Sequence, residues 1–421
     1  MKKFHYILCS LLIACCPLIY AFDWGLQLNQ TLNIDGVSNG SDSQDHKLGY
    51  SGTLLPWFSA PFGSSHCVGK LYLSAGITAL YTEKYTDKTT FFIPELFRTE
   101  LTWHVGTGNE VKLGRMLYTD PLGFIASGLF DGARFSVALG NGVFSTGLWY
   151  TGLLYKKSAN ITMTADDNIA YNEEFDFSRF GDTYFAPRRL IIAMDWDNPY
   201  TAPWLRLKAS FIGQFDLSHS DMLYHSQYLA IRAGIPAGSF IFNLGGCVGL
   251  AELPKDIKIS FAGEFGVAWM LPTSITDKLQ LTCRLTTGMT EDSSFTAFVP
   301  ITTVSQGDIL QAKLSGLSML RLDYTARLHE TFSFNIASSY FIASDYKTYQ
   351  GFPYGSPDGG DGLLLGNEFS GRLVWAPFSD LQLNLGGGIF LPSMGNSGHS
   401  TEGSQSGALW RVNLSVVLAI F

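Results

Sequence analysis

Basic side chains recur at alternate positions within strand-like segments of this chain, where a row of positive charges could bind anions. Successive side chains of a β-strand point to opposite faces, so a basic residue out of phase with its apolar neighbours lies on the other face. The basic residues assigned to this polar face are Arg98, Arg134, Arg189, Arg206, Lys208, Arg284, Arg321, Arg327, Arg372 and Arg411. Because rings of charged side chains select ions, the chemistry that this set predicts is electrostatic recognition of anions.

Fewer acidic residues share the polar face, namely Glu100, Asp195, Glu264, Asp323 and Glu368. Acids concentrate between the strand-like segments, as in Asp166-Asp167 and Glu173-Glu174, so the formal net charge is −8 although the polar face is biased toward positive charge. An alternative interpretation is that the arginines pair with the inward acids and only brace a filled interior. Both interpretations are kept.

Signals for catalysis or metal binding are weak. None of the eight histidines lies in an HExxH motif or at metal-ligand spacing, and the cysteines form no CxxC pair. The run Gly386–Gly388 lies within a strand pattern and matches no phosphate-binding loop. Asp358 and Asp361 could bind a cation, but a flexible loop explains them better. We therefore expect no catalytic residue, no metal and no cofactor, and the acidic composition disfavours nucleic acid.

The basic residues must be positioned by amphipathic strands, and the segment Ile257–Trp269 is an example. Its apolar residues share one parity, whereas Lys258, Ser260 and Glu264 lie on the other. Strands with one apolar and one mixed face are typical of antiparallel sheets, and the pattern recurs along the whole chain. We expect an all-β fold, a transmembrane antiparallel up-and-down β-barrel of about 14 to 18 strands, with 18 as the best count.

Short and long connections alternate between these segments. If the first polar loop, at 35–46, lies at the outer end, then so do the long connections at about 156–187, 290–317, 343–362 and 392–407. The connection at 252–255 is short for that end. At the other end Asn141-Gly142 suits a type I′ hairpin, in which both central residues need positive φ. Outer-membrane barrels have this asymmetry of short and long connections.

Seven of the nine tryptophans lie where the predicted strands meet the short connections. Amphipathic rings gather where a barrel meets the lipid headgroups, whereas an ordinary core would not restrict tryptophan to one rim. The tryptophans assigned to this aromatic girdle are Trp24, Trp57, Trp103, Trp196, Trp204, Trp269 and Trp375.

Residues 1–21 are interpreted as a cleavable export signal, followed by a single domain over 22–421. Lys2 and Lys3 precede the apolar stretch Ile7–Leu18, and Ala21 ends a plausible cleavage site. A lipid on Cys15, within the lipobox-like Leu12–Cys15, is the alternative. The mean hydropathy of +0.12 and the lack of any later long apolar run exclude a bundle of membrane helices.

The signal, the amphipathic segments and the terminal Phe421 resemble Gram-negative-type outer-membrane β-barrels. This resemblance implies a bacterial outer-membrane location and recognition of the last strand by the barrel assembly machinery. The alternation over Val412–Ile420 is one residue out of phase with Phe421. Gly114-Arg115 and Phe130–Arg134 are similar to a segment of the alginate-export and substrate-selective porin families. The chain also resembles fatty-acid-transporter barrels, although those usually carry a long plug before the first strand.

Arg115 does not fit the alternation, since it shares the parity of Val111 and Leu113. This position predicts either a bulge or a strand end that has left the membrane.

The sequence thus predicts a porin, a passive channel for small hydrophilic and, given its basic wall, anionic solutes, and not an enzyme. Long connections, including Lys156–Pro187, would fold inward and narrow the pore. Two alternatives are a transporter of hydrophobic substrates and a surface barrel whose loops bind a host or partner molecule. The expected partners are outer-membrane lipid, a small solute and the assembly machinery, and a homo-oligomer is left open.

Overall fold

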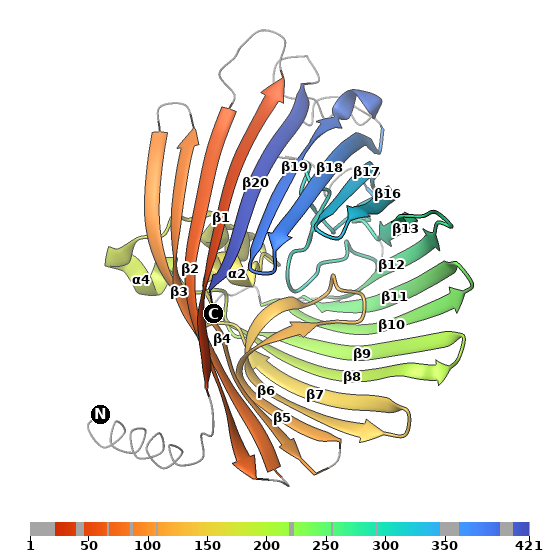
Figure 1. Ribbon diagram of the computed structural model, residues 1–421. Coiled ribbons are helices and arrows are strands. Elements are labelled where there is room, and N and C mark those ends of the chain that lie inside the picture. Colours follow the sequence, from red (N-terminus) through yellow and green to blue (C-terminus); the bar gives the residue numbers. More distant parts are fainter. Residues whose placement is uncertain are drawn as a thin grey trace.

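The computed structural model describes residues 22–38, 46–64, 67–84, 87–106, 108–218, 223–253, 256–290, 294–345, 362–395 and 407–420. They form a closed antiparallel barrel of 18 strands, drawn in Figure 1. Closure is complete because β1 pairs with β2 on one side and with β20 on the other. The predicted fold and the best strand count are confirmed. The export signal, Cys15, Asp358, Asp361 and Phe421 lie outside the described residues.

The barrel strands follow one another around the wall in chain order. They are β1 (Asp23–Ser38), β2 (His46–Ser64), β3 (Cys67–Lys84), β4 (Asp87–Val105), β5 (Asn109–Thr119), β6 (Ser127–Leu139), β7 (Gly142–Tyr150), β8 (Arg189–Ala202), β9 (Leu205–Asp216), β10 (His225–Ala237), β11 (Phe240–Glu252), β12 (Ile257–Met270), β13 (Thr276–Thr286), β16 (Leu317–His329), β17 (Phe332–Ala343), β18 (Leu364–Phe378), β19 (Leu381–Leu391) and β20 (Ala408–Ile420).

The remaining elements lie in the connections: α2 (Lys156–Ala159), α3 (Ala165–Asn172), η2 (Phe177–Arg179), α4 (Phe180–Thr183), β14 (Ser305–Gln306), β15 (Ala312–Lys313) and η3 (Pro392–Met394). No helix in the described part of the chain is long and apolar enough to cross a membrane.

Pairing register places the apolar and polar sets on opposite faces of the wall. Leu28 lies opposite Leu54, which lies opposite Ile77, and the last two are 44% and 51% exposed. The next residues, Asn29 and Thr53, pair on the inner face. Each barrel strand carries at least one large exposed apolar side chain, so the outer surface of the barrel is apolar.

Two local predictions concerned connections. Leu139 pairs with Gly142, so the hairpin turn is Gly140-Asn141, and of these only Gly140 has positive φ, at 58°. A glycine with positive φ at the first central position is the pattern of a type II′ turn. The predicted type I′ turn at Asn141-Gly142 is therefore wrong in type, and its position is wrong by one residue. The short connection between Glu252 and Ile257 joins two barrel strands and leaves the count unchanged.

The part of the barrel interior next to the long connections is a packed core. Residues of the β5–β6, β7–β8 and β13–β16 connections, among them Ile125, Ile161 and Phe298, are buried in one cluster with the inward wall residues Trp149 and Ile191. Burying each such large side chain contributes about 1.5–3 kcal/mol. The β7–β8 connection therefore folds inward over its first part, from Leu154 to Met163, and the β13–β16 connection folds inward as well.

The wall between β4 and β5 is paired only over part of its height. Pairing runs from Val105 with Asn109 to Thr99 with Arg115, whereas β4 continues to Asp87. At this point Gly114 has a φ of 107°, and Arg115 is 5% exposed. Arg115 pairs with Asp131 at 2.7 Å and donates to the carbonyl oxygens of Leu96 and Leu153. Arg115, whose side chain did not fit the alternation of its strand, thus lies at the point where β5 separates from β4.

Candidate functional site

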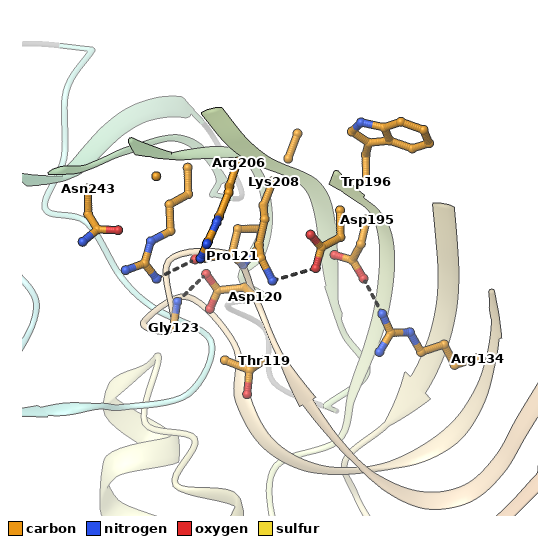
Figure 2. A pocket seen from close by; sticks show the side chains of 14 residues that line it. Thr119, Asp120, Pro121, Gly123, Arg134, Asp195, Trp196, Arg206, Lys208 and Asn243 are labelled. Atoms are coloured by element: carbon orange, nitrogen blue, oxygen red, sulfur yellow. Dashed lines mark hydrogen bonds and ion pairs between the residues drawn. The ribbon is translucent and has the colours of Figure 1, made fainter. Parts of the chain in front are cut away.

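The first cavity, which we call the Arg206 pocket, lies in the barrel interior and has a volume of about 440 Å³. Figure 2 shows basic side chains from several strands converging on it. Its charged lining residues are Arg134 on β6, Asp195 and Asp197 on β8, Arg206 and Lys208 on β9, Arg232 on β10, and Asp120 in the β5–β6 connection.

The cations of this pocket differ in how far they are neutralised. Lys208 pairs with Asp197 at 2.6 Å, Arg134 with Asp195 at 3.7 Å, and Arg232 with Glu264 at 3.5 Å. Within the described ranges, Arg206 has no acid within ion-pair distance, and its side chain is exposed. The pocket therefore presents positive charge to any solute that enters.

Asp120 lines the same pocket, and its carboxylate organises the β5–β6 connection. Oδ1 accepts the N–H groups of Leu122 and Gly123 at 2.8 and 3.0 Å, and Oδ2 accepts those of Ile125 and Ala126 at 2.9 and 3.0 Å. Burial raises the pKa of Asp120 even though these four bonds oppose the shift. The carboxylate fixes a tight loop against the wall.

The second cavity, the Asp308 pocket, has a volume of about 290 Å³ and is lined by three arginines and one acid. Asp308 Oδ2 lies 3.1 Å from Arg321 Nη2, Oδ1 lies 3.7 Å from Arg372 Nη2, and the Asp308 carbonyl accepts from Arg411 Nη1 at 3.2 Å. A neighbouring cavity of about 280 Å³ shares Asp308 and Arg321 and adds Arg284. The β13–β16 connection thus inserts a carboxylate among wall arginines.

Glu368 holds this acid in place. It is fully buried, and its two oxygens accept the backbone N–H groups of Asp308, Ile309 and Leu310 at 2.7, 3.0 and 2.9 Å. Burial would raise the pKa of Asp308, but its bond from the Ser370 hydroxyl and the charge of Arg321 outweigh burial and hold the pKa below its usual value. Asp308 is therefore ionised at neutral pH.

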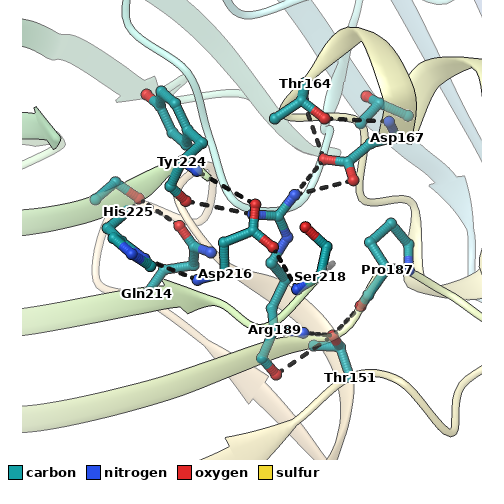
Figure 3. A network of polar contacts seen from close by, with 12 residues as sticks. Thr151, Thr164, Asp167, Pro187, Arg189, Gln214, Asp216, Ser218, Tyr224 and His225 are labelled. Carbon is teal, nitrogen blue, oxygen red and sulfur yellow. Dashed lines mark hydrogen bonds and ion pairs between the residues drawn. The ribbon is translucent and has the colours of Figure 1, made fainter. Parts of the chain in front are cut away.

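Arg189 occupies a different environment, shown in Figure 3. Its side chain is 1% exposed and pairs with Asp167 at 2.7 Å and with Asp216 at 2.5 Å. Asp167 also closes a capping box with Thr164 at the start of α3. Arg189 therefore ties the β7–β8 connection to β9 and lines neither cavity. For this residue the bracing interpretation holds, because the connection covers it.

The other predicted basic residues lie outside the two named pockets. Arg98 pairs with Glu100 at 2.9 Å, and Arg327 donates to the carbonyl of Glu330 beside a short connection. Sequence reasoning missed Arg232, although it alternates with the exposed Leu229 and Ile231. It also missed Asp308, for which no periodic signal exists.

Six of the seven tryptophans assigned to the girdle lie on the outer face or in a turn. Trp24, Trp103, Trp204 and Trp375 are exposed, and Trp196 and Trp269 are partly exposed beside outward apolar residues. Trp57 differs, because Trp24 pairs with Phe58 and Trp57 therefore lies opposite Gly25 on the inner face. Its parity excludes it from an outer girdle, and β2 continues beyond it to Ser64, so it does not lie at the end of its strand.

In the ranges that the structure describes, no three His, Cys, Asp or Glu side chains are grouped as metal ligands would be.

The chain was compared with known proteins. No family model and no curated protein matches it. Among solved structures it is similar to OccK11 (OpdR) of Pseudomonas aeruginosa, with a TM-score of 0.60 and 12% identity over 96% of this chain and 98% of that one. It is also similar to the outer membrane protein OprD of Pseudomonas aeruginosa, with a TM-score of 0.58 and 14% identity over 96% and 95% of the two chains. A third structure, Pseudomonas aeruginosa OccK2 (OpdF) in complex with glucuronate, has a TM-score of 0.58 and 11% identity over 96% and 100%.

These likenesses support the barrel fold of the outer-membrane type that the sequence resemblance implied. None of the three structures carries an alginate-export or fatty-acid-transporter name.

Proposed function

We propose that this chain is an outer-membrane channel through which small hydrophilic anions, carboxylates in particular, diffuse passively. The observation that carries the proposal is the Arg206 pocket, a cavity inside a closed barrel where an exposed arginine has no acid within ion-pair distance among the described residues. The apolar outer face supports a position in lipid, and the charged cavities argue against a lumen built for hydrophobic substrates.

The mechanism is selection by charge in a narrowed passage. The inward connections restrict the lumen, so a solute passes close to the wall cations. Guanidinium groups match the geometry of a carboxylate and can hold it with two hydrogen bonds. Because exposed ion pairs contribute only about 0–1 kcal/mol, the solute is also released quickly, as conduction requires.

The membrane contacts are part of the same proposal. Trp24, Trp103, Trp196, Trp204, Trp269 and Trp375 would lie in the headgroup layer near the short connections. The last strand, ending at Phe421, would be recognised by the barrel assembly machinery after export. Since β1 and β20 close the barrel within one chain, a homo-oligomer is not needed to form the channel.

Solute entry into proteoliposomes tests the proposal. OccK2 was solved with glucuronate, so glucuronate is a reasonable probe, and glucose is its neutral counterpart. We expect swelling to be faster with glucuronate than with glucose. Equal rates would contradict charge selection. A barrel that passes neither solute would overturn the channel itself, and uptake of a fatty acid or loop-dependent adhesion would then identify one of the alternatives.

A further inference from the structure

Strand β4 has an edge without a strand partner over Asp87–Arg98, on the side that faces β5. Its pairing with β5 ends where Thr99 lies opposite Arg115, whereas its pairing with β3 continues to Asp87. Among the described residues, no other strand pairs with this edge. Lipid offers no hydrogen bonds to open backbone groups, so a strand edge at membrane depth has to be covered by another part of the protein.

Two side chains, and not a backbone ladder, join this edge to the β7–β8 connection. The carbonyl oxygen of Pro94 accepts from the Tyr184 hydroxyl at 2.8 Å. The carbonyl oxygen of Leu96 accepts from Arg115 Nη1, and Arg115 Nη2 donates to the carbonyl of Leu153 at 3.0 Å. Pro94 has no N–H, which makes the edge a poor template for a further strand. We call this contact between the β4 edge and the connection the β4 seam.

An aromatic cluster covers the inner side of the β4 seam. Tyr155, Phe175 and Tyr184 of the connection are buried together with Ile93, an inner-face residue of β4. The rings of Phe180 and Tyr184 are stacked, with centroids 4.6 Å apart. Apolar packing is non-directional, so such a contact tolerates small displacements that would break a hydrogen-bonded ladder.

The outer side of the β4 seam is apolar on both of its borders. Phe92 and Leu96 of β4 are exposed, and so is Leu153 of the connection. Phe177 is 63% exposed, and its ring centroid lies 4.8 Å from that of the buried Phe175. Figure 1 shows α4, which follows Phe177 in the same connection, projecting beyond the strands on this side of the barrel. The apolar outer face of the wall therefore continues onto the connection.

We propose that an acyl chain of an outer-leaflet lipid binds along the β4 seam and holds the β7–β8 connection in its inward position. Lipid is the favoured occupant because the exposed borders of the seam continue the lipid-facing wall. The same connection contributes Leu154–Met163 to the packed interior, so a chain wedged at the seam pushes this part toward the lumen and narrows the pore. This inference goes beyond the proposed channel, which needs no bound lipid.

The first test measures whether the seam touches lipid. A nitroxide is attached at Phe177→Cys in a cysteine-free background, and the chain is reconstituted into phosphatidylcholine vesicles. We expect oxygen, which concentrates in lipid, to relax the label more than a nickel chelate, which stays in water. Leu148→Cys on the outer wall and Arg206→Cys in the Arg206 pocket are the lipid and water controls. A label at 177 that behaves like the one at 206 would overturn lipid binding. Spectral broadening by a neighbouring label would also overturn it, because a second copy of the chain would then cover the seam.

The second test supplies the acyl chain covalently after the barrel has folded. Dodecyl methanethiosulfonate is reacted with Leu153→Cys, and single-channel conductance is compared before and after. We expect a fall of roughly twofold, because a ligand shifts the connection only by its difference in affinity for the two positions. The same reagent on Leu148→Cys, an exposed outer-wall position on β7, is the matched control and should change nothing. An unchanged or higher conductance at 153 would overturn the coupling to the pore. The nitroxide measurement does not require conduction, so the failure of the channel proposal and the failure of lipid binding are distinguishable.

Discussion

Arg189 and Arg206 lie on neighbouring strands and both point into the barrel, but their surroundings differ. Arg189 is the first residue of β8, at the end where the long β7–β8 connection enters, and it is 1% exposed between Asp167 and Asp216. Arg206 is the second residue of β9, beside a short connection, and it is exposed in a water-accessible cavity. Position along the strand, relative to the inward connections, decides whether a wall cation braces the fold or faces solute.

The largest effect is expected from Arg189→Ala. The substitution leaves Asp167 and Asp216 buried without their cation, and removing one partner of a buried pair costs about 3–5 kcal/mol. The free energy of unfolding, followed by circular dichroism in detergent, should fall by that amount. Arg206→Ala is the matched control and should change it by less than about 0.5 kcal/mol. If the two variants were equally stable, Arg189 would not stabilise the fold more than Arg206 does, and the proposed distinction between the two arginines would be wrong.

A smaller effect, on selectivity instead of stability, is expected from Arg206→Glu. Reversing this charge should repel anions and so reduce the anion-to-cation permeability ratio. We expect a reduction of only roughly three- to fivefold, because charge–charge interactions in hydrated surroundings are weak. Reversal potentials in planar bilayers measure the ratio. Arg327→Glu is the control, since Arg327 is exposed but lies outside both named pockets. An equal shift in the two variants would mean that overall charge, and not the Arg206 pocket, sets selectivity.

Asp308→Asn should act in the opposite direction. It keeps the shape of the side chain but removes the negative charge facing Arg321 and Arg372, so glucuronate should block the current at a concentration about two- to fivefold lower. Ser370→Ala, which removes one hydrogen bond to Asp308 and keeps every charge, should have a weaker effect. Weaker block in Asp308→Asn would show that the acid helps the solute to bind.

The smallest effect is expected from mild acidification. The pKa of Asp308 is held below its usual value of 3.8 by Ser370 and the arginines, so its ion pairs contribute stability above that value. That contribution is lost only as the pH falls through the still lower pKa of the folded protein. The difference in glucuronate block between the wild type and Asp308→Asn should therefore stay constant between neutral pH and a pH just above 3.8. A change in that difference within this window would mean that Asp308 is not held ionised by its neighbours.

Strand periodicity was sufficient to predict the barrel and its 18 strands. It could not predict burial, because Arg189 and Arg206 have the same alternation and differ only in whether a connection covers them. Trp57 shows a second limit, since the sequence placed it both at a strand end and on the outer face, whereas it lies within β2 and on the inner face.

Contacts made by the connections were beyond sequence reasoning. Asp308 reaches Arg372 across 64 residues of chain only because Glu368 fixes three backbone N–H groups of its loop. Such pairing depends on tertiary placement and leaves no local pattern. Arg232, in contrast, follows the alternation of its strand and could have been included.

The most direct test of the central claim is the reversal potential of the wild-type barrel in a potassium chloride gradient. The chain carries a formal net charge of −8, so selectivity set by overall charge would favour potassium. If the wall cations control passage, the sign of the potential will report a preference for chloride. A potassium preference, or no current at all, would contradict the account.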